Sequence, residues 1–262
     1  MGKTLLSSLN SFVANLMMGP YIAGLYASLS QLQLMGTTFG STVAGSFVPR
    51  IYELYAQDRL TELRAYLIRS SRYLSAMLGV AAGCLLIYGS SFVWFWIGVD
   101  MSEYGSAVTI LALTILLANS TEVYVRCFMA ANKLRVPALA SLALGLCNFL
   151  MIIFFCGPLG MGLTGIMLAS SLAAIALSLV VYVPYLTFVL HIKTREVASS
   201  MLPGVLSLVI SFLVSLIANK LVPASGWLTL FESALLSSVV SLGICLLPLF
   251  ITDRMTGIHF QS

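Results

Sequence analysis

The chain has 262 residues, of which 60% are hydrophobic and only 8% are charged. Soluble domains carry roughly 25% charged residues, so this composition excludes an ordinary water-soluble globule and favours a helix bundle surrounded by lipid. The net charge of +4 does not indicate a nucleic-acid partner, because no basic face is interleaved with aromatic residues.

Eight apolar segments follow one another along the chain, and most reach the roughly 20 residues that a helix needs to cross a membrane. They cover residues 4–18, 22–48, 73–97, 106–125, 137–156, 161–190, 200–221 and 227–251. The first is short and stops at Gly19-Pro20, which indicates either a stubby helix or one whose beginning is missing. The sequence therefore predicts an all-α polytopic membrane protein with about eight transmembrane helices.

Basic residues mark one side of the membrane, because cytoplasmic loops are enriched in Lys and Arg. Alternate connections carry Arg50, Arg59, Arg64, Arg69 and Arg72, then Arg126, Lys133 and Arg135, then Lys193 and Arg195, and finally Arg254. Trp94, Trp96 and Trp227 stand at the opposite ends of their segments, where an aromatic belt is expected. The pattern predicts a multi-pass protein of the cytoplasmic membrane with both termini in the cytoplasm, and only Lys220 departs from it.

Residues 59–72, RLTELRAYLIRSSR, have the pattern of a separate basic amphipathic helix on the inner membrane surface. Such a helix is either a solvated connection or a contact for anionic lipid headgroups. Its one acidic residue, Glu62, together with Glu53 and Asp58, fits a charged, solvated helix better than the paired acids of an enzyme. We therefore expect a protein that is not an enzyme.

Neither a metal nor a cofactor is indicated. The five cysteines form no CxxC pair and lie in or beside apolar segments, where cysteine behaves as a small hydrophobic residue. Residues 160–165 match the GxGxxG pattern, but a dinucleotide site also needs a preceding strand and an acid about 20 residues further on. No Asp or Glu occurs between Glu122 and Glu196. These glycines therefore indicate a tight turn and close helix packing.

Polar side chains inside the apolar segments are the candidate functional residues, because they are costly in a membrane and usually face a cavity or a partner helix. Segment 22–48 carries five of them at steps of three or four, which places them on one helix face: Tyr26, Ser30, Gln33, Thr37 and Ser41. This stripe suits either a water-filled lumen or packing against another helix through hydroxyl groups.

Three more polar residues share one face near the end of the fourth segment: Asn119, Glu122 and Arg126. Glu122 and Arg126 are four residues apart and can pair, either as a structural ion pair or as part of a gate or headgroup contact. Asn148 lies within the fifth segment, where interhelical hydrogen bonding and a cavity position both remain open. Lys220 and Glu232 flank a short turn and are predicted to form a structural pair.

The order of several short motifs resembles a known family. In chain order they are Gly24-Leu25-Tyr26, Val48-Pro49-Arg50, Ala56-Gln57-Asp58-Arg59, Trp96-Ile97-Gly98, Ala130-Ala131-Asn132-Lys133, and the run GPLGMGLTG at 157–165 that follows the helix with Asn148. Together they resemble the carboxy-terminal part of a polysaccharide-biosynthesis flippase, the O-antigen type of the multidrug/oligosaccharidyl-lipid/polysaccharide exporter superfamily.

The resemblance implies a two-lobed transporter whose six-helix bundles face a central cavity and move a polyprenyl-pyrophosphate-linked oligosaccharide to the outer leaflet. Residues 1–192 would form the second lobe, and residues 193–262 two additional helices and a short cytoplasmic tail. The amino-terminal lobe would be a missing segment or a partner chain. The expected partners are then the lipid-linked oligosaccharide, membrane lipids and that lobe.

The resemblance also implies cationic residues that hold the pyrophosphate, since a guanidinium binds phosphate oxygens bidentately and stays charged. The candidate substrate-binding residues are Arg126 first and Arg50 second, with Glu122, Asn119, Asn148, Gln33, Thr37 and Ser41. Family members often carry an acid sixteen positions before the tyrosine that matches Tyr26, whereas this chain has Asn10. Charge-dependent coupling at that position is therefore in question.

Two alternatives to a flippase stay open. An ion-coupled multidrug exporter of the same superfamily would need acidic residues deep in the spans, and Glu122 and Glu232 are the ones that approach this. The chain could also be a non-transporting membrane partner subunit or a fragment.

Overall fold

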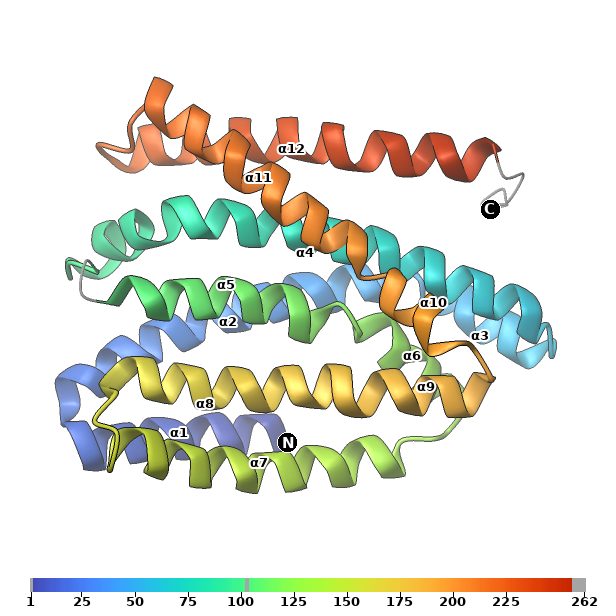
Figure 1. Ribbon diagram of the computed structural model, residues 1–262, viewed down its shortest axis with the longest axis horizontal. Coiled ribbons are helices and arrows are strands. Elements are labelled where there is room, and N and C mark those ends of the chain that lie inside the picture. Colours follow the sequence, from blue (N-terminus) through green and yellow to red (C-terminus); the bar gives the residue numbers. More distant parts are fainter. Residues whose placement is uncertain (1, 102–103, 256–262) are drawn as a thin grey trace.

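The computed structural model describes residues 2–101 and 104–255, with side chains from residue 10 to residue 251, and every regular element in these ranges is helical. In chain order they are α1 (Gly2–Met18), α2 (Pro20–Ser46), α3 (Val48–Ala56), α4 (Leu60–Ile97), α5 (Gly105–Asn119), α6 (Glu122–Ala130), α7 (Arg135–Cys156), α8 (Gly162–Ala176), the π-helical segment η2 (Leu177–Tyr182), α9 (Val183–Leu190), α10 (Thr194–Ser199), α11 (Leu202–Leu221) and α12 (Trp227–Met255). The long helices run roughly along one axis, and α11 crosses the others obliquely (Figure 1). The predicted all-α polytopic fold is confirmed.

Six stretches of the described chain are long and apolar enough to cross a membrane: Leu60–Ile97, Gly105–Ala130, Arg135–Cys156, Gly162–Leu190, Thr194–Leu221 and Trp227–Ile251. They correspond to the last six of the eight predicted segments. α1 has 17 residues and is slightly short. α2 is long enough with 27 residues, but its hydroxyl and amide side chains make it less apolar than the six. A helix of this kind needs polar surroundings for part of its surface.

The prediction of a separate surface helix at residues 59–72 was wrong. This stretch forms the first turns of α4, which continues without a break for 38 residues from Leu60 to Ile97. Neither Pro nor Gly occurs between Leu60 and Leu78, so no helix breaker separates residues 59–72 from the rest of α4. At 1.5 Å per residue α4 is about 57 Å long, so its arginine-bearing turns extend beyond the hydrocarbon layer.

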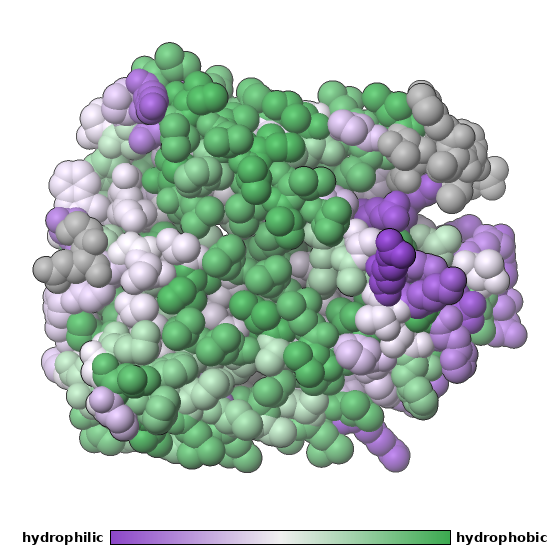
Figure 2. All heavy atoms as spheres, viewed as in Figure 1, coloured by the Kyte–Doolittle hydropathy of each residue, from purple (hydrophilic) through white to green (hydrophobic). Residues whose placement is uncertain are grey.

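The bundle has two chemically different ends (Figures 1 and 2). One end, which we call the basic end, carries α3, the α6–α7 connection and the α9–α10 connection, with Arg59, Arg64, Lys133, Arg135, Lys193 and Arg195. The opposite, aromatic end carries Trp94, Trp96 and Trp227, which are all exposed. Trp227 packs edge-on against Phe92, with ring centroids 5.6 Å apart. An apolar band separates the two ends, as a membrane protein requires (Figure 2).

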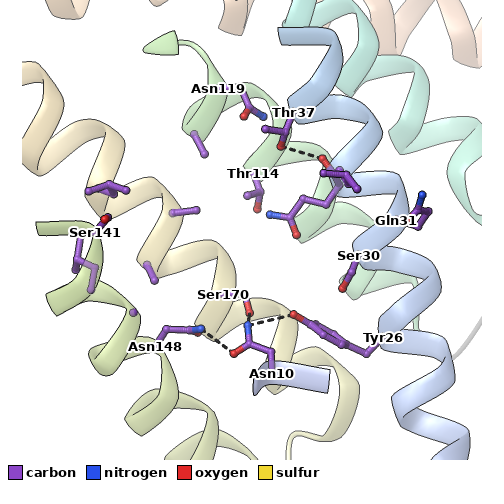
Figure 3. Close-up of a pocket in the computed structure, with 18 of the residues that line it drawn as sticks. Asn10, Tyr26, Ser30, Gln31, Thr37, Thr114, Asn119, Ser141, Asn148 and Ser170 are labelled. Atoms are coloured by element: carbon purple, nitrogen blue, oxygen red, sulfur yellow. Dashed lines mark hydrogen bonds between the residues drawn. The ribbon is translucent and has the colours of Figure 1, made fainter. Parts of the chain in front are cut away.

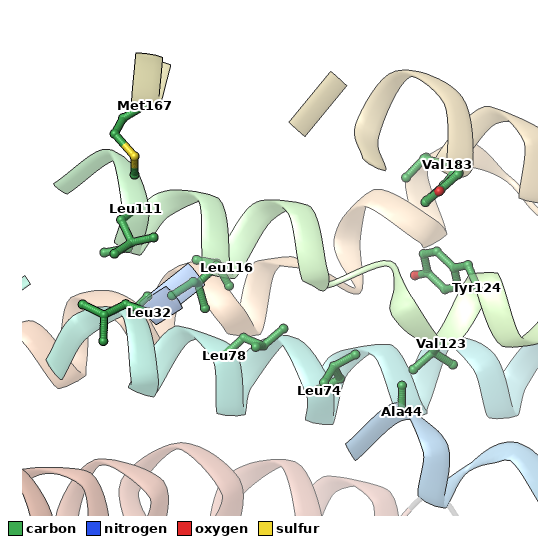
Figure 4. Packing of buried hydrophobic residues seen from close by; sticks show 14 of the residues in the cluster. Leu32, Ala44, Leu74, Leu78, Leu111, Leu116, Val123, Tyr124, Met167 and Val183 are labelled. Carbon is green, nitrogen blue, oxygen red and sulfur yellow. The ribbon is translucent and has the colours of Figure 1, made fainter. Parts of the chain in front are cut away.

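Buried apolar side chains of α4, α5 and α8 form a continuous core beside the polar cavity described below. The cluster includes Leu74 and Leu78 of α4, Leu111 and Leu116 of α5, and Met167 of α8, and Leu116 lies beside Leu78 (Figure 4). All five side chains are at most 2% exposed. This packing fixes α5 and α8, which supply two of the cavity's walls.

α11 and α12 are fastened to α4 through small and hydroxyl-bearing residues. A Cβ atom added to Gly79 would lie 2.1 Å from the carbonyl oxygen of Gly204, so α4 and α11 touch backbone to backbone. Ser211 donates a hydrogen bond to the carbonyl oxygen of Val80 at 2.9 Å. The Tyr88 hydroxyl donates to the carbonyl oxygen of Ser215 at 3.1 Å. Close approach through small residues is the usual way in which membrane helices associate.

The predicted ion pair between Lys220 and Glu232 does not occur in the described part of the chain. The turn between α11 and α12 is closed by uncharged groups instead. Ser233 donates to the carbonyl oxygen of Val222 at 2.9 Å, and the backbone N–H of Ala224 donates to Asn219 Oδ1 at 3.3 Å.

Candidate functional site: a polar cavity inside the bundle

A cavity of about 570 Å³ lies among α1, α2, α5, α7, α8, η2 and the first residue of α6 (Figure 3). Each of these helices contributes at least one polar side chain to the lining; that of η2 is Tyr182 and that of α6 is Glu122. The polar lining residues are Asn10, Ser11, Tyr26, Ser30, Gln31, Gln33, Thr37, Thr114, Asn119, Glu122, Ser141, Asn148, Ser170 and Tyr182. Such a concentration of polar groups inside an apolar bundle is costly unless it serves a function.

Asn10 is the centre of a hydrogen-bonded cluster that joins four helices on the wall of the cavity (Figure 3). Its Nδ2 donates to the Tyr26 hydroxyl at 3.2 Å and to Ser170 Oγ at 3.1 Å. Its Oδ1 accepts from Asn148 Nδ2 at 3.0 Å. Asn10 and Asn148 are 6% and 5% exposed. The cluster therefore ties α1, α2, α7 and α8 together without any charged group.

Two buried oxygen atoms of the lining have no hydrogen-bond partner in the structure. They are Oδ1 of Asn148 and Oγ of Ser30. A buried acceptor that makes no hydrogen bond costs roughly 1–3 kcal/mol. These atoms are suited to accept hydrogen bonds from a donor group that enters the cavity.

α2 forms one wall because glycine lets it approach α5 closely. A Cβ atom added to Gly36 would lie 2.7 Å from Ile115 of α5. This approach directs Tyr26, Ser30, Gln33 and Thr37 of α2 into the cavity, while Thr37 Oγ1 donates back to the Gln33 carbonyl oxygen at 3.0 Å. Four of the five residues of the predicted polar stripe thus face one chamber.

The wall nearest the basic end contains Asn119, Glu122, Leu177 and Tyr182. Glu122 carries the one carboxylate among the lining residues, and the lining includes neither Lys nor Arg. Asn119 Nδ2 donates to the carbonyl oxygen of Ile115 at 2.9 Å. The cavity is therefore a mainly uncharged chamber with a single acid at one end.

Of the eight predicted substrate-binding residues, the structure brings five to this cavity: Gln33, Thr37, Asn119, Glu122 and Asn148. Sequence reasoning missed Thr114, Ser170 and Tyr182 as lining residues, and singled out Asn10 only as a departure from a family pattern. The available signal for Asn10 was an amide inside an apolar segment, and Asn15 in the same segment gave the same signal. Ser170 and Thr114 gave little signal, because hydroxyl groups satisfied within their own helix are common in membrane helices.

The other three predicted residues lie outside the lining. Arg126 of α6 contacts α2, where its Nη2 donates to the carbonyl oxygen of Ser41 at 3.3 Å. Its Nε is buried and makes no hydrogen bond. Arg50 of α3 instead pairs with Glu53 at 2.7 Å on the surface. The Arg50 hydrogen bond holds the pKa of the Glu53 carboxyl below its usual value, and Glu53 in turn raises the pKa of Arg50.

No cluster of His, Cys, Asp and Glu among the described residues could hold a metal ion. The cavity groups can donate and accept hydrogen bonds, and they surround a volume within the range of small-ligand sites, about 300–1,000 Å³. The fold and the cavity together define a polytopic helical membrane protein with a polar internal chamber.

Comparison with known proteins gives one relative. Over 176 residues, 66% of its length, the chain is 29% identical to the "Uncharacterized membrane protein EpsK" of Bacillus subtilis strain 168. The matched segment spans 34% of that protein, about a third of its length. No family model matches the chain, and no solved structure matches it. The likeness agrees with a multi-pass membrane protein.

Proposed function

We propose that the chain forms part of a transporter that flips polyprenyl-pyrophosphate-linked oligosaccharide repeat units across the cytoplasmic membrane for polysaccharide biosynthesis. The observation that carries this proposal is the chamber of amides and hydroxyls within an apolar helix bundle. Polar groups at that depth usually mark a substrate path. The proposal assigns no bond-breaking step, and therefore no enzymatic activity, to the chain.

The chemistry of the lining fits the sugar part of such a substrate. Sugar hydroxyls donate and accept hydrogen bonds, and Asn148 Oδ1 and Ser30 Oγ are buried acceptors without partners. The pyrophosphate is a poor ligand for the same chamber, because Glu122 is there and no cationic side chain is. We assign the pyrophosphate to the basic end, with Arg126 as the first candidate and Arg50 as the second.

A second helix bundle belongs to the proposal, as a further part of the same protein or as a partner chain. The outward face of α2 carries Thr38 and Thr42, which are both exposed. Such a face is unfavourable against lipid tails, whereas α7 and α12 expose mainly apolar side chains that suit membrane lipids. We infer that a polar path or a second bundle covers α2.

The test is reconstitution of the chain, alone and with the upstream or neighbouring chain of its genome, in vesicles that contain a fluorescent polyprenyl-pyrophosphate-linked oligosaccharide. Transbilayer movement exposes the inner-leaflet fluorophores to external dithionite. We expect Asn148→Leu to slow this movement and Leu146→Ala to leave it unchanged, because Leu146 is exposed on the lipid side of the same helix. Absence of movement in both preparations, with folded protein, overturns the proposal.

Glu122 favours a second candidate, an ion-coupled multidrug exporter, because it places an acid in the cavity wall. A carboxylate in the wall of such a cavity can bind a proton or cation in exchange for a cationic substrate. This alternative predicts efflux of a cationic dye that depends on an imposed proton or sodium gradient and is lost in Glu122→Gln. If dye efflux needs no ion gradient, or if Glu122→Gln does not change it, the exporter is excluded. The flippase and a non-transporting partner subunit are then the two functions that stay.

A further inference from the structure

Two helices lose their regular α-helical path side by side at the basic end of the cavity. The first interruption separates α5 from α6 at Ser120 and Thr121. The second is η2, where six residues adopt π-helical geometry between α8 and α9. Thr121 Oγ1 and Ser178 Oγ are 2.8 Å apart, and Ser178 Oγ also donates to the carbonyl oxygen of Leu117 at 3.0 Å. The two interruptions are thus directly bonded to each other.

Local sequence explains both interruptions. Asn119, Ser120 and Thr121 all bond to backbone carbonyls of the preceding turn, and such side chains compete with the helix and bend it. Pro184, the second residue of α9, has no N–H for the carbonyl four residues earlier and crowds that turn. A π-helical segment before Pro184 accommodates the missing bond. π-helical turns inside α-helices occur frequently at functional sites.

The two sides of this junction are held by different kinds of contact. α6 is anchored, because the buried Tyr124 hydroxyl bonds to Ser71 Oγ of α4 at 2.9 Å and to Ser200 Oγ at 2.6 Å. α9 is held by apolar and aromatic packing: Val183, Leu186 and Leu190 are buried, while Phe188 is 72% exposed. Phe128 of α6 contacts the rings of Tyr182 in η2 and Tyr185 in α9, with centroids 6.1 and 5.1 Å apart.

The same junction borders the chamber. Asn119 and Glu122 line the cavity from the first interruption, and Leu177 and Tyr182 line it from the second. Any change in the winding of η2 must move the Leu177 and Tyr182 side chains relative to the cavity. Discontinuous helices next to internal cavities are a recurrent feature of transporters.

We propose that η2 and α9 form a gate at the basic end of the cavity, which swings against the fixed α6. Rewinding of η2 moves α9, and the Thr121–Ser178 hydrogen bond latches the closed position shown here. The motion of the gate does not depend on which molecule enters the chamber. The gate can therefore be tested separately from the proposed flippase activity.

A matched pair of substitutions tests the latch. Thr114 and Ser171 join the same two helices through an equivalent hydroxyl pair, 2.6 Å apart, seven residues nearer the aromatic end. Thr121→Val and Thr114→Val each remove one such hydrogen bond and keep the side-chain shape. In amide hydrogen exchange of the full chain in nanodiscs, we expect Thr121→Val to speed exchange of residues 177–184 about fivefold, the effect of one lost hydrogen bond. We expect Thr114→Val to leave the exchange rate of residues 177–184 unchanged.

A third variant tests the hinge with the opposite sign. Pro184→Ala restores the N–H that an α-helix needs, so residues 177–184 should exchange more slowly than in the wild type. Spin labels at Phe188→Cys and Leu139→Cys, both exposed positions, should report a broader distance distribution in Thr121→Val and a narrower one in Pro184→Ala. The gate proposal is overturned if the amides of residues 177–184 exchange at the same rate in Thr121→Val and Thr114→Val. It is also overturned if their exchange in Pro184→Ala is no slower than in the wild type. Transport measurements are not needed for either outcome.

Discussion

Asn148 Nδ2 donates a hydrogen bond to Asn10 Oδ1 at 3.0 Å, and this bond joins α7 to α1 across 138 positions of the sequence. Both side chains are amides, which do not titrate in the physiological range, so the bond is formed at any pH at which the protein folds. The centre of the chamber is therefore held by uncharged groups, and Glu122 supplies the one carboxylate among its lining residues.

Removal of the Asn10 amide should loosen this four-helix junction. Asn10→Ala leaves Asn148, Tyr26 and Ser170 without their shared partner. Interhelical hydrogen bonds in membrane proteins contribute about 1 kcal/mol, and we expect a loss of that order in the free energy of unfolding, measured by denaturing-detergent titration. Asn15→Ala, an exposed position on the same helix, serves as the control. Equal stability of the two variants would show that the junction contributes nothing.

The contact between α4 and α11 should tolerate no side chain at Gly79. Gly79→Ala places a methyl group against the Gly204 carbonyl oxygen, so α11 must shift, at a cost of about 1–3 kcal/mol. Gly243→Ala is the matched control in α12, because no atom lies within 4 Å of its added Cβ. We expect a lower thermal midpoint for Gly79→Ala and an unchanged or slightly higher one for Gly243→Ala, since alanine favours helices. An unchanged thermal midpoint in Gly79→Ala would mean that α4 and α11 do not make the backbone contact between Gly79 and Gly204.

Tyr124→Phe should destabilise the anchor of α6. The substitution removes the hydroxyl that bonds to Ser71 and Ser200 while it keeps the buried ring. The expected loss is about 1 kcal/mol, visible as faster amide exchange in α6 and α10. Tyr52→Phe, at an exposed position of α3, should have no effect. Unchanged exchange in Tyr124→Phe would contradict the fixed role given to α6.

Arg126 should affect transport more than stability if it holds the pyrophosphate. We expect Arg126→Ala to lower flipping of the lipid-linked oligosaccharide and Arg126→Lys to restore part of it, because lysine keeps the charge but not the bidentate geometry. The hydrogen bond to the Ser41 carbonyl gives a competing structural explanation. Unfolding measurements on both variants separate the two, because a purely structural role predicts parallel losses of stability and transport. Equal transport by all three proteins at equal membrane level removes Arg126 from the site.

Much of the fold could be predicted from the sequence because membrane helices are recognised by length and hydropathy, which are local properties. The last six predicted segments match the six apolar stretches of the structure. The surface helix at 59–72 was misjudged because charged residues suggested a separate element, whereas a helix can continue past the hydrocarbon when nothing breaks it. The polar face of α2 was equally visible, since helical spacing alone aligns Tyr26, Ser30, Gln33 and Thr37.

What the sequence determined by itself is the class of protein and the identity of the buried polar side chains, because both follow from the cost of polar groups in hydrocarbon. Only the tertiary structure decided which of these side chains share a chamber. Asn10 and Asn148 are far apart in the chain yet bonded to each other, and Arg126 lies one turn from Glu122 yet does not line the cavity. Such choices depend on how helices rotate and approach through contacts such as Gly79 with Gly204, and no local pattern encodes that rotation.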